Sequence, residues 1–288
     1  MSGSSSIPHG ILSEYAAAAA RAAAAAGDLI RRHFGARLAV QTKRSPVDLV
    51  TSVDRAAERL IAQRLTRAYP AVGFFGEEYG ERKPEARYRW VVDPIDGTNN
   101  FVHGLPIIGV SIGLQDCGSP AAHRSRRGAP PAGAMLVGII YDPLRRELFA
   151  AVQGAGATLN GRRIAVSPTR RLAHSLVSTG FSSNFLKRRQ PYLRWFETLQ
   201  RRSHGVRRIG STVWCLAAVA AGRLEAFYEL DLWPWDMAAG ILLVKEAGGR
   251  VSNFAGGPPV LEQGRLVASN GWIHRELLEA LKTTPPRG

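Results

Sequence analysis

The chain has 288 residues, of which 45% are hydrophobic, and a formal net charge of +15. This length allows one large core or two fused lobes, and the hydrophobic share is that of an ordinary globular protein. No apolar run reaches the roughly 20 residues that a membrane-spanning helix needs. The first six residues lack the basic and apolar regions of a signal peptide, so we expect a cytoplasmic protein. Cys117 and Cys215 form neither a disulfide framework nor a zinc pattern.

Helix and strand patterns change in character near the middle of the chain. In the first half, helices are predicted over Ile11–Phe34 and over Val53–Ala68, the second capped by Ser52. Strands are predicted there at Val72–Phe75, Trp90–Val92, Ile107–Gln115, Ala134–Tyr141 and Glu147–Val152. In the second half, short strand patterns alternate with helical ones at Phe185–Arg202, Ser211–Ala221, Asp236–Ala247 and Trp272–Leu281.

This order predicts an α+β protein with two lobes. Residues 1–175 are expected to form a lobe with a larger antiparallel sheet, and residues 176–288 an α/β lobe. Two stretches stand apart by composition. Asp116–Gly133 is rich in Pro, Gly, Ala and Arg and is predicted to be a surface loop. Asn160–Gly210 holds twelve Lys or Arg against one acid, Glu197, which would attract anions from phosphate esters to RNA; the alternative is a set of solvated faces.

The most informative segment runs from Trp90 to Phe101. A strand pattern is expected to stop at Asp93, a Pro-Ile turn leads to Asp96, and Gly97 and Thr98 follow at once. Mg²⁺ prefers a few carboxylate oxygens together with waters and phosphate. The backbone N–H groups of the Gly-Thr pair suit a phosphate oxygen beside such a cation. The alternative is a turn with two solvated acids.

Further acids fall where a strand or loop meets a helix. Glu77 and Glu78 follow a predicted strand, Asp48 precedes the second helix, and Asp236 opens a later one. Glu77 could instead be a solvated turn residue, and Asp236 could complement a helix dipole. No two histidines have the i, i+4 spacing of zinc ligands, and neither a nucleophile-elbow nor a P-loop motif is present. Acids, Mg²⁺ and water are the best candidate apparatus.

Two segments match the signatures of a known family. Asp93–Thr98 resembles the first signature of the inositol monophosphatase family, and Trp235–Gly240, running into Val244–Gly249, resembles the second. Further segments match in the same order at Asp48–Thr51, Gly76–Glu78 and Arg208–Ser211. The resemblance covers Ile11 to Leu281 and is closest to the bacterial inositol-1-monophosphatase branch.

The resemblance implies the layered αβαβα sandwich of the lithium-sensitive sugar phosphatases, usually a homodimer. It implies Mg²⁺-dependent hydrolysis of a phosphate monoester, foremost inositol monophosphate, by metal-activated water. Two to three Mg²⁺ ions per subunit are expected. Glu77, Asp93 and the carbonyl of Ile95 would hold the first. Asp93, Asp96 and Asp236 would hold the second, while a third would lean on Glu77 through waters.

The resemblance also assigns roles around the substrate. Asp48 and Thr98, together with Glu77, would orient the nucleophilic water. The expected substrate-binding residues are Asp96, Gly97, Thr98, Thr212 and Glu229. Of these, Gly97 and Thr98 would donate to the phosphate, whereas Glu229 and Asp96 would bind hydroxyl groups of a small phosphorylated polyol.

Several alternatives stay open. Relatives cleave histidinol phosphate or fructose 1,6-bisphosphate, and a metal-dependent nuclease could use the same acids. A different class of function is also open, because some bacterial members that resemble this chain act as partners of the transcription machinery. The basic stretch would suit an RNA-associated partner, but a pure binding role would not require the metal-ligating acids.

Overall fold

The computed structural model describes residues 7–36, 40–42, 49–118, 133–182 and 185–282. The helices are α1 (His9–His33), α2 (Ser52–Ala68), α3 (Thr98–Val102), α4 (Arg189–Arg202), α5 (Thr212–Ala220), α6 (Pro234–Glu246) and α7 (His274–Lys282). The strands are β1 (Val40–Thr42), β2 (Leu49–Thr51), β3 (Gly73–Gly76), β4 (Gly80–Arg82), β5 (Tyr88–Asp96), β6 (Gly109–Asp116), β7 (Ala134–Asp142), β8 (Glu147–Val152), β9 (Gly156–Leu159), β10 (Arg162–Arg163), β11 (Val177–Thr179), β12 (Val206–Arg208), β13 (Ala226–Leu230), β14 (Arg250–Ser252) and β15 (Arg265–Ser269).

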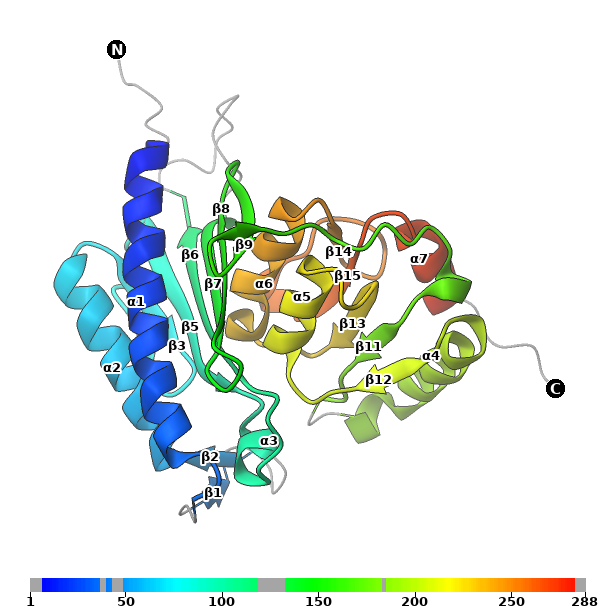
Figure 1. The fold of residues 1–288 in the computed structure, drawn as a ribbon, viewed down its shortest axis with the longest axis horizontal. Coiled ribbons are helices and arrows are strands. Elements are labelled where there is room, and N and C mark those ends of the chain that lie inside the picture. The colour runs from blue at the N-terminus through cyan, green and yellow to red at the C-terminus, as the bar shows by residue number, and fades with distance from the viewer. Residues whose placement is uncertain (1–6, 37–39, 43–48, 119–132, 183–184, 283–288) are drawn as a thin grey trace.

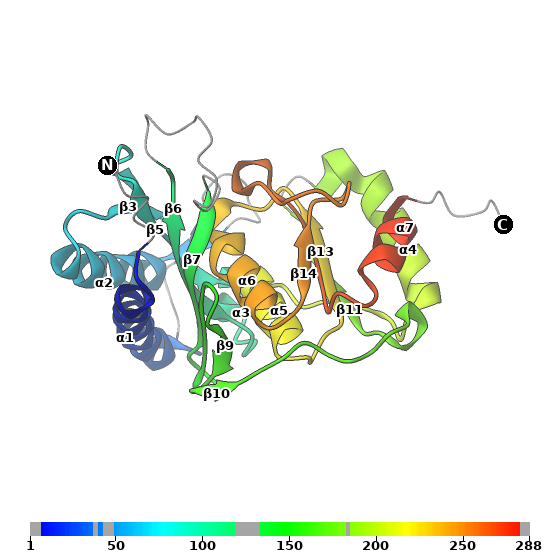
Figure 2. The same cartoon turned by 90° about the horizontal axis from the view of Figure 1, so that it is seen from above.

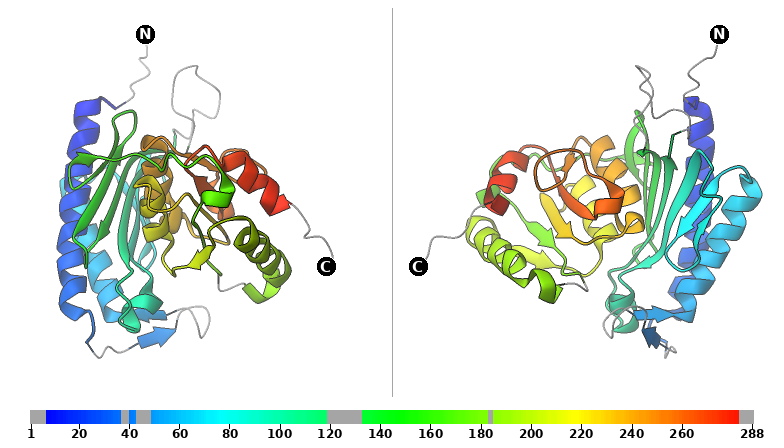
Figure 3. Two further views of the ribbon diagram at one scale, coloured as in Figure 1. Left: turned by 45° about the vertical axis from the view of Figure 1, so that its right-hand side comes forward. Right: turned by 180° about the vertical axis from the view of Figure 1, so that it is seen from behind.

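Helices and sheets stack in alternating layers (Figure 1). α1 and α2 cover the outer face of the large sheet, and α5 and α6 lie between the large and the small sheet. α4 and α7 cover the far face of the small sheet, as the view from above also shows (Figure 2). Figure 3 shows α1 and α7 at opposite ends of the stack. This order confirms the expected αβαβα sandwich.

The two sheets differ in strand direction. Within the described residues, the large sheet has the order β10-β9-β8-β7-β6-β5-β3-β4 and is antiparallel except for the pair β3–β5. The small sheet has the order β12-β11-β13-β15-β14, with β11 parallel to both of its neighbours. The expected contrast between a larger antiparallel sheet and a smaller α/β unit is therefore present. The boundary after residue 175 stays a prediction, because α6 packs against both sheets.

Small residues bring the first helix close to the large sheet. Ala19, Ala22, Ala23 and Ala26 are buried on one face of α1. A Cβ at Gly27 would lie 2.4 Å from the Tyr141 ring on β7. The Ala-rich segment is thus a packed helix rather than a membrane span. In the described part of the chain no helix is long and apolar enough to cross a membrane.

The strand before the first signature is longer than expected. β5 continues to Asp96, and its pairing with β6 shifts register between Asp93 and Asp96. Pro94 has no N–H to donate to a neighbouring strand, which accounts for the interruption. The Ile95 N–H donates instead to the Asp93 carboxylate at 3.0 Å. The two acids therefore lie on either side of an irregularity within a strand, not beyond its end.

The cap of α2 also differs from the prediction. The N-cap is Thr51, not Ser52. The Thr51 hydroxyl accepts from the backbone of Val53 and Asp54, and the Asp54 carboxylate accepts from the Thr51 N–H at 2.8 Å and from its hydroxyl at 2.6 Å. This reciprocal capping box satisfies several N-terminal groups at once. A serine cap at position 52 without a reciprocal acid would satisfy fewer of these N–H groups.

The stretch predicted as a loop begins later than expected. Asp116 is the last residue of β6 and accepts hydrogen bonds from the Arg87 guanidinium at 3.2 and 3.1 Å. Residues 119–132 lie outside the described part of the chain. Cys215 is buried in α5, and burial raises the pKa of its thiol.

Candidate active site

Three aspartates from two segments meet at one point. Carboxylate oxygens of Asp93, Asp96 and Asp236 all lie within 4.8 Å of one another. β5 supplies the first two, and the first turn of α6 supplies the third from the other half of the chain. An all-oxygen donor set of this kind suits a hard divalent cation. The residues present therefore fit the metal that the sequence predicts.

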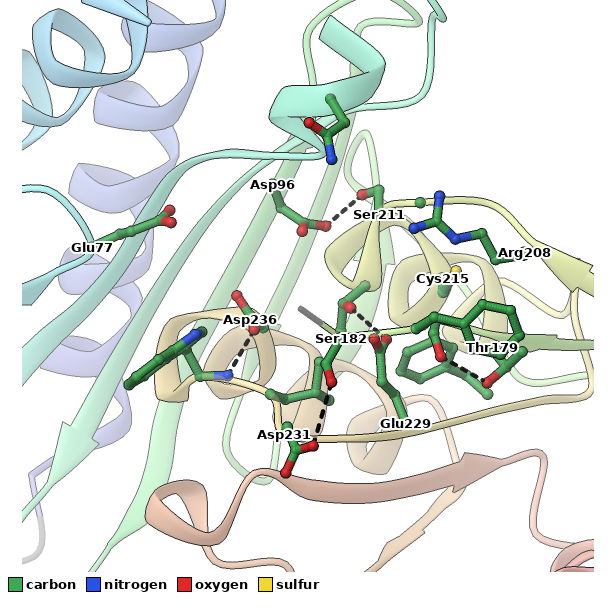
Figure 4. Close-up of a pocket in the computed structure, with 18 residues that line it drawn as sticks. Glu77, Asp96, Thr179, Ser182, Arg208, Ser211, Cys215, Glu229, Asp231 and Asp236 are labelled. Carbon is green, nitrogen blue, oxygen red and sulfur yellow. Dashed lines mark hydrogen bonds between the residues drawn. The ribbon is translucent and has the colours of Figure 1, made fainter. Parts of the chain in front are cut away.

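The same acids line two adjoining cavities. One, of about 160 Å³, is lined by Asp93, Ile95, Thr98 and seven other residues, among them Glu77, Asp96 and Asp236. The other, of about 260 Å³, shares Glu77, Asp96 and Asp236 and extends to Thr212, Glu229 and Asp231. Figure 4 shows Glu77, Asp96 and Asp236 around one part of this second cavity and Glu229 farther along it. The two cavities therefore adjoin at these three acids.

Asp236 is fixed by the start of its own helix. Its carboxylate accepts from the Trp233 N–H at 2.7 Å. Burial raises the pKa of Asp236 well above its usual range, and the negative charges of Asp96 and Glu77 raise it further. The positive end of the α6 dipole favours the ionised form of Asp236, but this effect offsets only part of the rise in its pKa. A bound cation would relieve this repulsion.

Asp96 is held by the start of α5. One carboxylate oxygen accepts from the Ser211 hydroxyl and, at 2.7 Å, from the Val213 N–H. Burial raises the pKa of Asp96 to about 6, although these donors and the Gly97 N–H lower it. Gly97 has a φ of +89°, and a Cβ there would lie 3.0 Å from the Ile107 carbonyl oxygen, so the turn into α3 requires glycine. The N–H of Gly97 thus donates a hydrogen bond to the Asp96 carboxylate. Its donation to a phosphate stays a prediction.

Glu77 follows β3 and faces the cluster from the neighbouring strand. Its N–H donates to the Val92 carbonyl at 3.2 Å, which sets it beside the strand that carries Asp93. The β3–β5 pair is parallel, so the carboxyl ends of both strands reach the same edge of the sheet. Glu77 and Asp93 therefore line the same cavity. The resemblance implied that they share a cation, but the parallel pairing was not predicted.

The partner of Thr98 is a residue that the sequence analysis missed. The Thr98 hydroxyl lies 3.0 Å from Asp54 Oδ1 and 3.0 Å from the Ile95 carbonyl oxygen. Asp54 is fully buried, although it belongs to the first turn of α2. Asp48, the expected partner, lies outside the described residues. The Thr-x-x-Asp pattern at residues 51–54 is the signal that could have pointed to Asp54, since a capping box fixes its carboxylate.

The second cavity contains a buried acid with a hydroxyl partner. The Thr212 hydroxyl donates to Glu229 Oε2 at 3.1 Å, and Glu229 is 6% exposed. Burial raises the pKa of Glu229 to about 8, an effect that Thr212 opposes. A Cβ at Gly180 would lie 2.1 Å from the same carboxylate, so glycine leaves the space in which Glu229 sits. Asp231 accepts from the Ser182 hydroxyl at 3.3 Å at the edge of this cavity.

Comparisons with known proteins show the family and the fold of the chain. The model of the inositol monophosphatase family matches residues 11–284. The Nus factor SuhB of Pseudomonas aeruginosa is 42% identical, over 93% of this chain and 96% of that protein. The inositol-1-monophosphatase of Synechocystis is 41% identical, over 93% of this chain and 88% of that protein. The solved inositol monophosphatase of Anabaena has a TM-score of 0.82 and 35% identity, and the match covers 96% of this chain and 98% of that structure.

Proposed function

The chain belongs to the inositol monophosphatase family and is a phosphatase, and we propose that it hydrolyses the phosphate monoester of a small polyol, foremost inositol monophosphate. One observation carries the proposal. A cavity lined by oxygen ligands adjoins a cavity lined by Glu229 and Thr212, and the two share Asp96 and Asp236. Phosphate and polyol would therefore occupy neighbouring spaces, with Glu77, Asp96 and Asp236 lining both.

We propose Mg²⁺ as the cofactor, with two to three ions per subunit. Glu77, Asp93 and the carbonyl of Ile95 would hold one ion, and Asp93, Asp96 and Asp236 another; Glu77 would also support a third. When bound, such ions neutralise phosphoryl oxygens, acidify water and stabilise the leaving alkoxide. Little covalent help is needed for phosphoryl transfer, which agrees with a site built from acids.

The residues around the phosphate would orient the attacking water. Thr98 would accept a hydrogen bond from the attacking water, because its own proton can be donated to Asp54 at 3.0 Å. We propose Asp54 for the role that the sequence analysis gave to Asp48. Glu77 lines the same cavity and would orient the water from the other side.

Glu229 would select the alcohol. It is buried at the far part of the second cavity and one of its oxygens is already held by Thr212. The other oxygen can bind a hydroxyl group, and a buried polar group left without such a partner costs about 1–3 kcal/mol. A polyol is therefore favoured over an alcohol without vicinal hydroxyls.

A substrate panel tests the proposal. Phosphate release is measured with myo-inositol 1-phosphate, histidinol phosphate, fructose 1,6-bisphosphate, 3′-phosphoadenosine 5′-phosphate and glycerol 2-phosphate, each with Mg²⁺. Cleavage of a phosphodiester is measured in the same panel. We expect the highest kcat/KM for the inositol ester and inhibition by Li⁺. A higher kcat/KM for histidinol phosphate or for fructose 1,6-bisphosphate would assign a different substrate within the family. Cleavage of a phosphodiester alone would point to a nuclease instead.

A role beside the transcription machinery is a second proposal. It is favoured by the likeness to a protein named as a Nus factor and by exposed arginines on α4 and β12: Arg189, Arg194, Arg201, Arg202, Arg207 and Arg208. Affinity capture from lysate, with and without nuclease, tests for an RNA-associated partner. We also propose a homodimer, which light scattering of the purified chain would measure.

A further inference from the structure

Glu58 is a fully buried acid on α2, next to the turn that follows Glu77. Carboxylates are rarely buried to this extent unless they are paired. In the described part of the chain no cation pairs with Glu58. Its partners are two backbone groups: the Glu78 N–H donates to Oε2 at 2.8 Å, and the Tyr79 N–H donates to Oε1 at 2.9 Å. The carboxylate therefore binds the backbone of one turn.

This turn is anchored on both sides of the proposed metal ligand. The Glu77 N–H donates to the Val92 carbonyl on β5, directly before Asp93 in the sequence. The next two amides donate to Glu58 on α2. Strand β5 and helix α2 thus fix three consecutive backbone amides. Together they set where the Glu77 side chain lies relative to Asp93, with which it lines one cavity.

Gly76 provides the space for this arrangement. A Cβ at Gly76 would lie 2.2 Å from Glu58 Oε1 and 2.6 Å from its Cδ, closer than real Cβ contacts come. Any other residue at this position would push the carboxylate away from the turn. The approach of Glu58, together with the Phe74 ring at 2.7 Å from the same Cβ position, therefore requires glycine before Glu77.

We propose that Glu58 is a positioning residue for the metal site, which holds the Glu78 and Tyr79 amides so that Glu77 faces the cation. The inference rests on the proposed role of Glu77 as a metal ligand. Loss of a partner that orients a metal ligand typically costs about 10- to 100-fold in metal affinity or activity. Glu58 lines neither cavity, so its loss should weaken cation binding without changing which alcohol is bound.

The substitution Glu58→Gln tests this role. It keeps the size of the side chain but replaces one acceptor oxygen by an NH₂ group, which cannot accept from an amide. Calorimetric titration of the full chain with Mg²⁺ should give a dissociation constant raised about 10-fold or more. The Mg²⁺ concentration for half-maximal phosphate release should rise in parallel, while KM for the phosphate ester stays close to that of the wild type.

Tyr79→Phe is the matched control in the same turn. It removes the exposed hydrogen bonds from Arg59 to the Tyr79 hydroxyl and from that hydroxyl to the Arg55 carbonyl, and leaves both backbone contacts with Glu58 in place. Mg²⁺ binding should then equal that of the wild type. A folded Glu58→Gln variant that binds Mg²⁺ as tightly as the wild type overturns the proposal, as does an equal loss in Tyr79→Phe.

Gly76→Ala provides a second variant should Glu58→Gln fail to fold. It leaves Glu58 chemically intact and obstructs its approach, so Mg²⁺ binding should weaken in the same way; wild-type affinity would contradict the proposal. The titration separates this inference from the proposed function. A wild-type chain that binds Mg²⁺ but cleaves no phosphate ester refutes the function alone, whereas an active chain whose variants bind Mg²⁺ normally refutes the role of Glu58 alone.

Discussion

The hydroxyl of Thr98 lies 3.0 Å from the carboxylate of Asp54, which stands 44 residues earlier in the chain. The other carboxylate oxygen of Asp54 accepts from the backbone and the hydroxyl of Thr51. One carboxylate oxygen of Asp54 is thus held by Thr51, and the other faces Thr98. A hydroxyl has one proton and two lone pairs, so donation to Asp54 leaves Thr98 able to accept from a water.

This relationship predicts that Asp54→Asn lowers kcat far more than it raises KM. An amide can turn its NH₂ group toward Thr98 and reverse the direction of the hydrogen bond. Positioned proton acceptors contribute about 10²- to 10⁴-fold, and we expect a loss at the lower end of this range. Thr98→Val should lose a similar factor, and the double variant little more, because both residues act on one water.

Steady-state kinetics of the three variants measure this coupling. Asp116→Asn serves as the control, since Asp116 is also buried but pairs with Arg87 away from both cavities. Losses that multiply in the double variant would show that Asp54 acts independently of Thr98.

Asp93→Asn should abolish most of the activity while the fold survives. The Asn side-chain oxygen can still accept from the Ile95 N–H, so the local backbone keeps its hydrogen bond. The substitution removes one of the three clustered carboxylates. Metal ions supply several kcal/mol of transition-state stabilisation, which corresponds to about 10³-fold or more in kcat. Turnover and circular dichroism are the measurements; near-normal turnover of a folded variant would refute the metal assignment.

Glu229→Gln should discriminate between substrates. If Glu229 binds polyol hydroxyls, hydrolysis of inositol 1-phosphate should fall by about 5- to 150-fold, as expected for 1–3 kcal/mol. Hydrolysis of a simple aryl phosphate, which presents no hydroxyls, should change little. Ratios of kcat/KM for the two esters give the answer, and equal losses would contradict a role in recognition.

Stability of the metal-free chain should fall as pH rises from about 4.5 to 8. Burial raises the pKa of Asp96 to about 6 and of Glu229 to about 8, from usual values of 3.8 and 4.5. Raised carboxyl pKa values mean that the folded state binds more protons than the unfolded state, so its stability is greatest below the unfolded values and is lost as pH rises through the folded ones.

Melting temperatures across this pH range, with and without Mg²⁺, measure the effect. Mg²⁺ should raise the Tm more at pH 8 than at pH 5, because it binds the ionised carboxylates. Glu229→Gln should flatten the metal-free pH profile. A metal-free Tm that increases from pH 5 to pH 8 would contradict these raised pKa values.

The sequence predicted the layered fold and the acids that converge, but not every contact between them. Strand patterns ended near Asp93 and Glu77, and the family resemblance placed both acids at one cation; the parallel pairing of β3 and β5 brings them to the same edge of the sheet. The partner of Thr98 could not be read in the same way, because its contact with Asp54 spans 44 residues and depends on how α2 is capped. Because the N-cap is Thr51 rather than Ser52, the acid three residues later that completes the capping box is Asp54.

Other differences have local causes. The strand β5 runs past Pro94 because its pairing with β6 resumes at Asp96, and the Asp93 carboxylate accepts from the Ile95 N–H between them; no strand pattern in the sequence encodes this contact. The short strands β4, β12 and β14 were not predicted. Each has three residues, which is too few to show an alternating pattern, and each is recognised as a strand only by its hydrogen bonds to the adjacent strand. Glu58 resembled an ordinary polar helix residue, and only the docked turn shows that it is buried.

The most direct test of the account is Mg²⁺-dependent phosphate release from myo-inositol 1-phosphate by the purified chain, with excess chelator and with Asp236→Asn as comparisons. Asp236 brings the carboxylate of the second half of the chain to Asp93 and Asp96. We predict rapid release with Mg²⁺, none with chelator, and a loss of about 10³-fold in the variant. Full activity in chelator, or in the folded variant, would contradict the central claim.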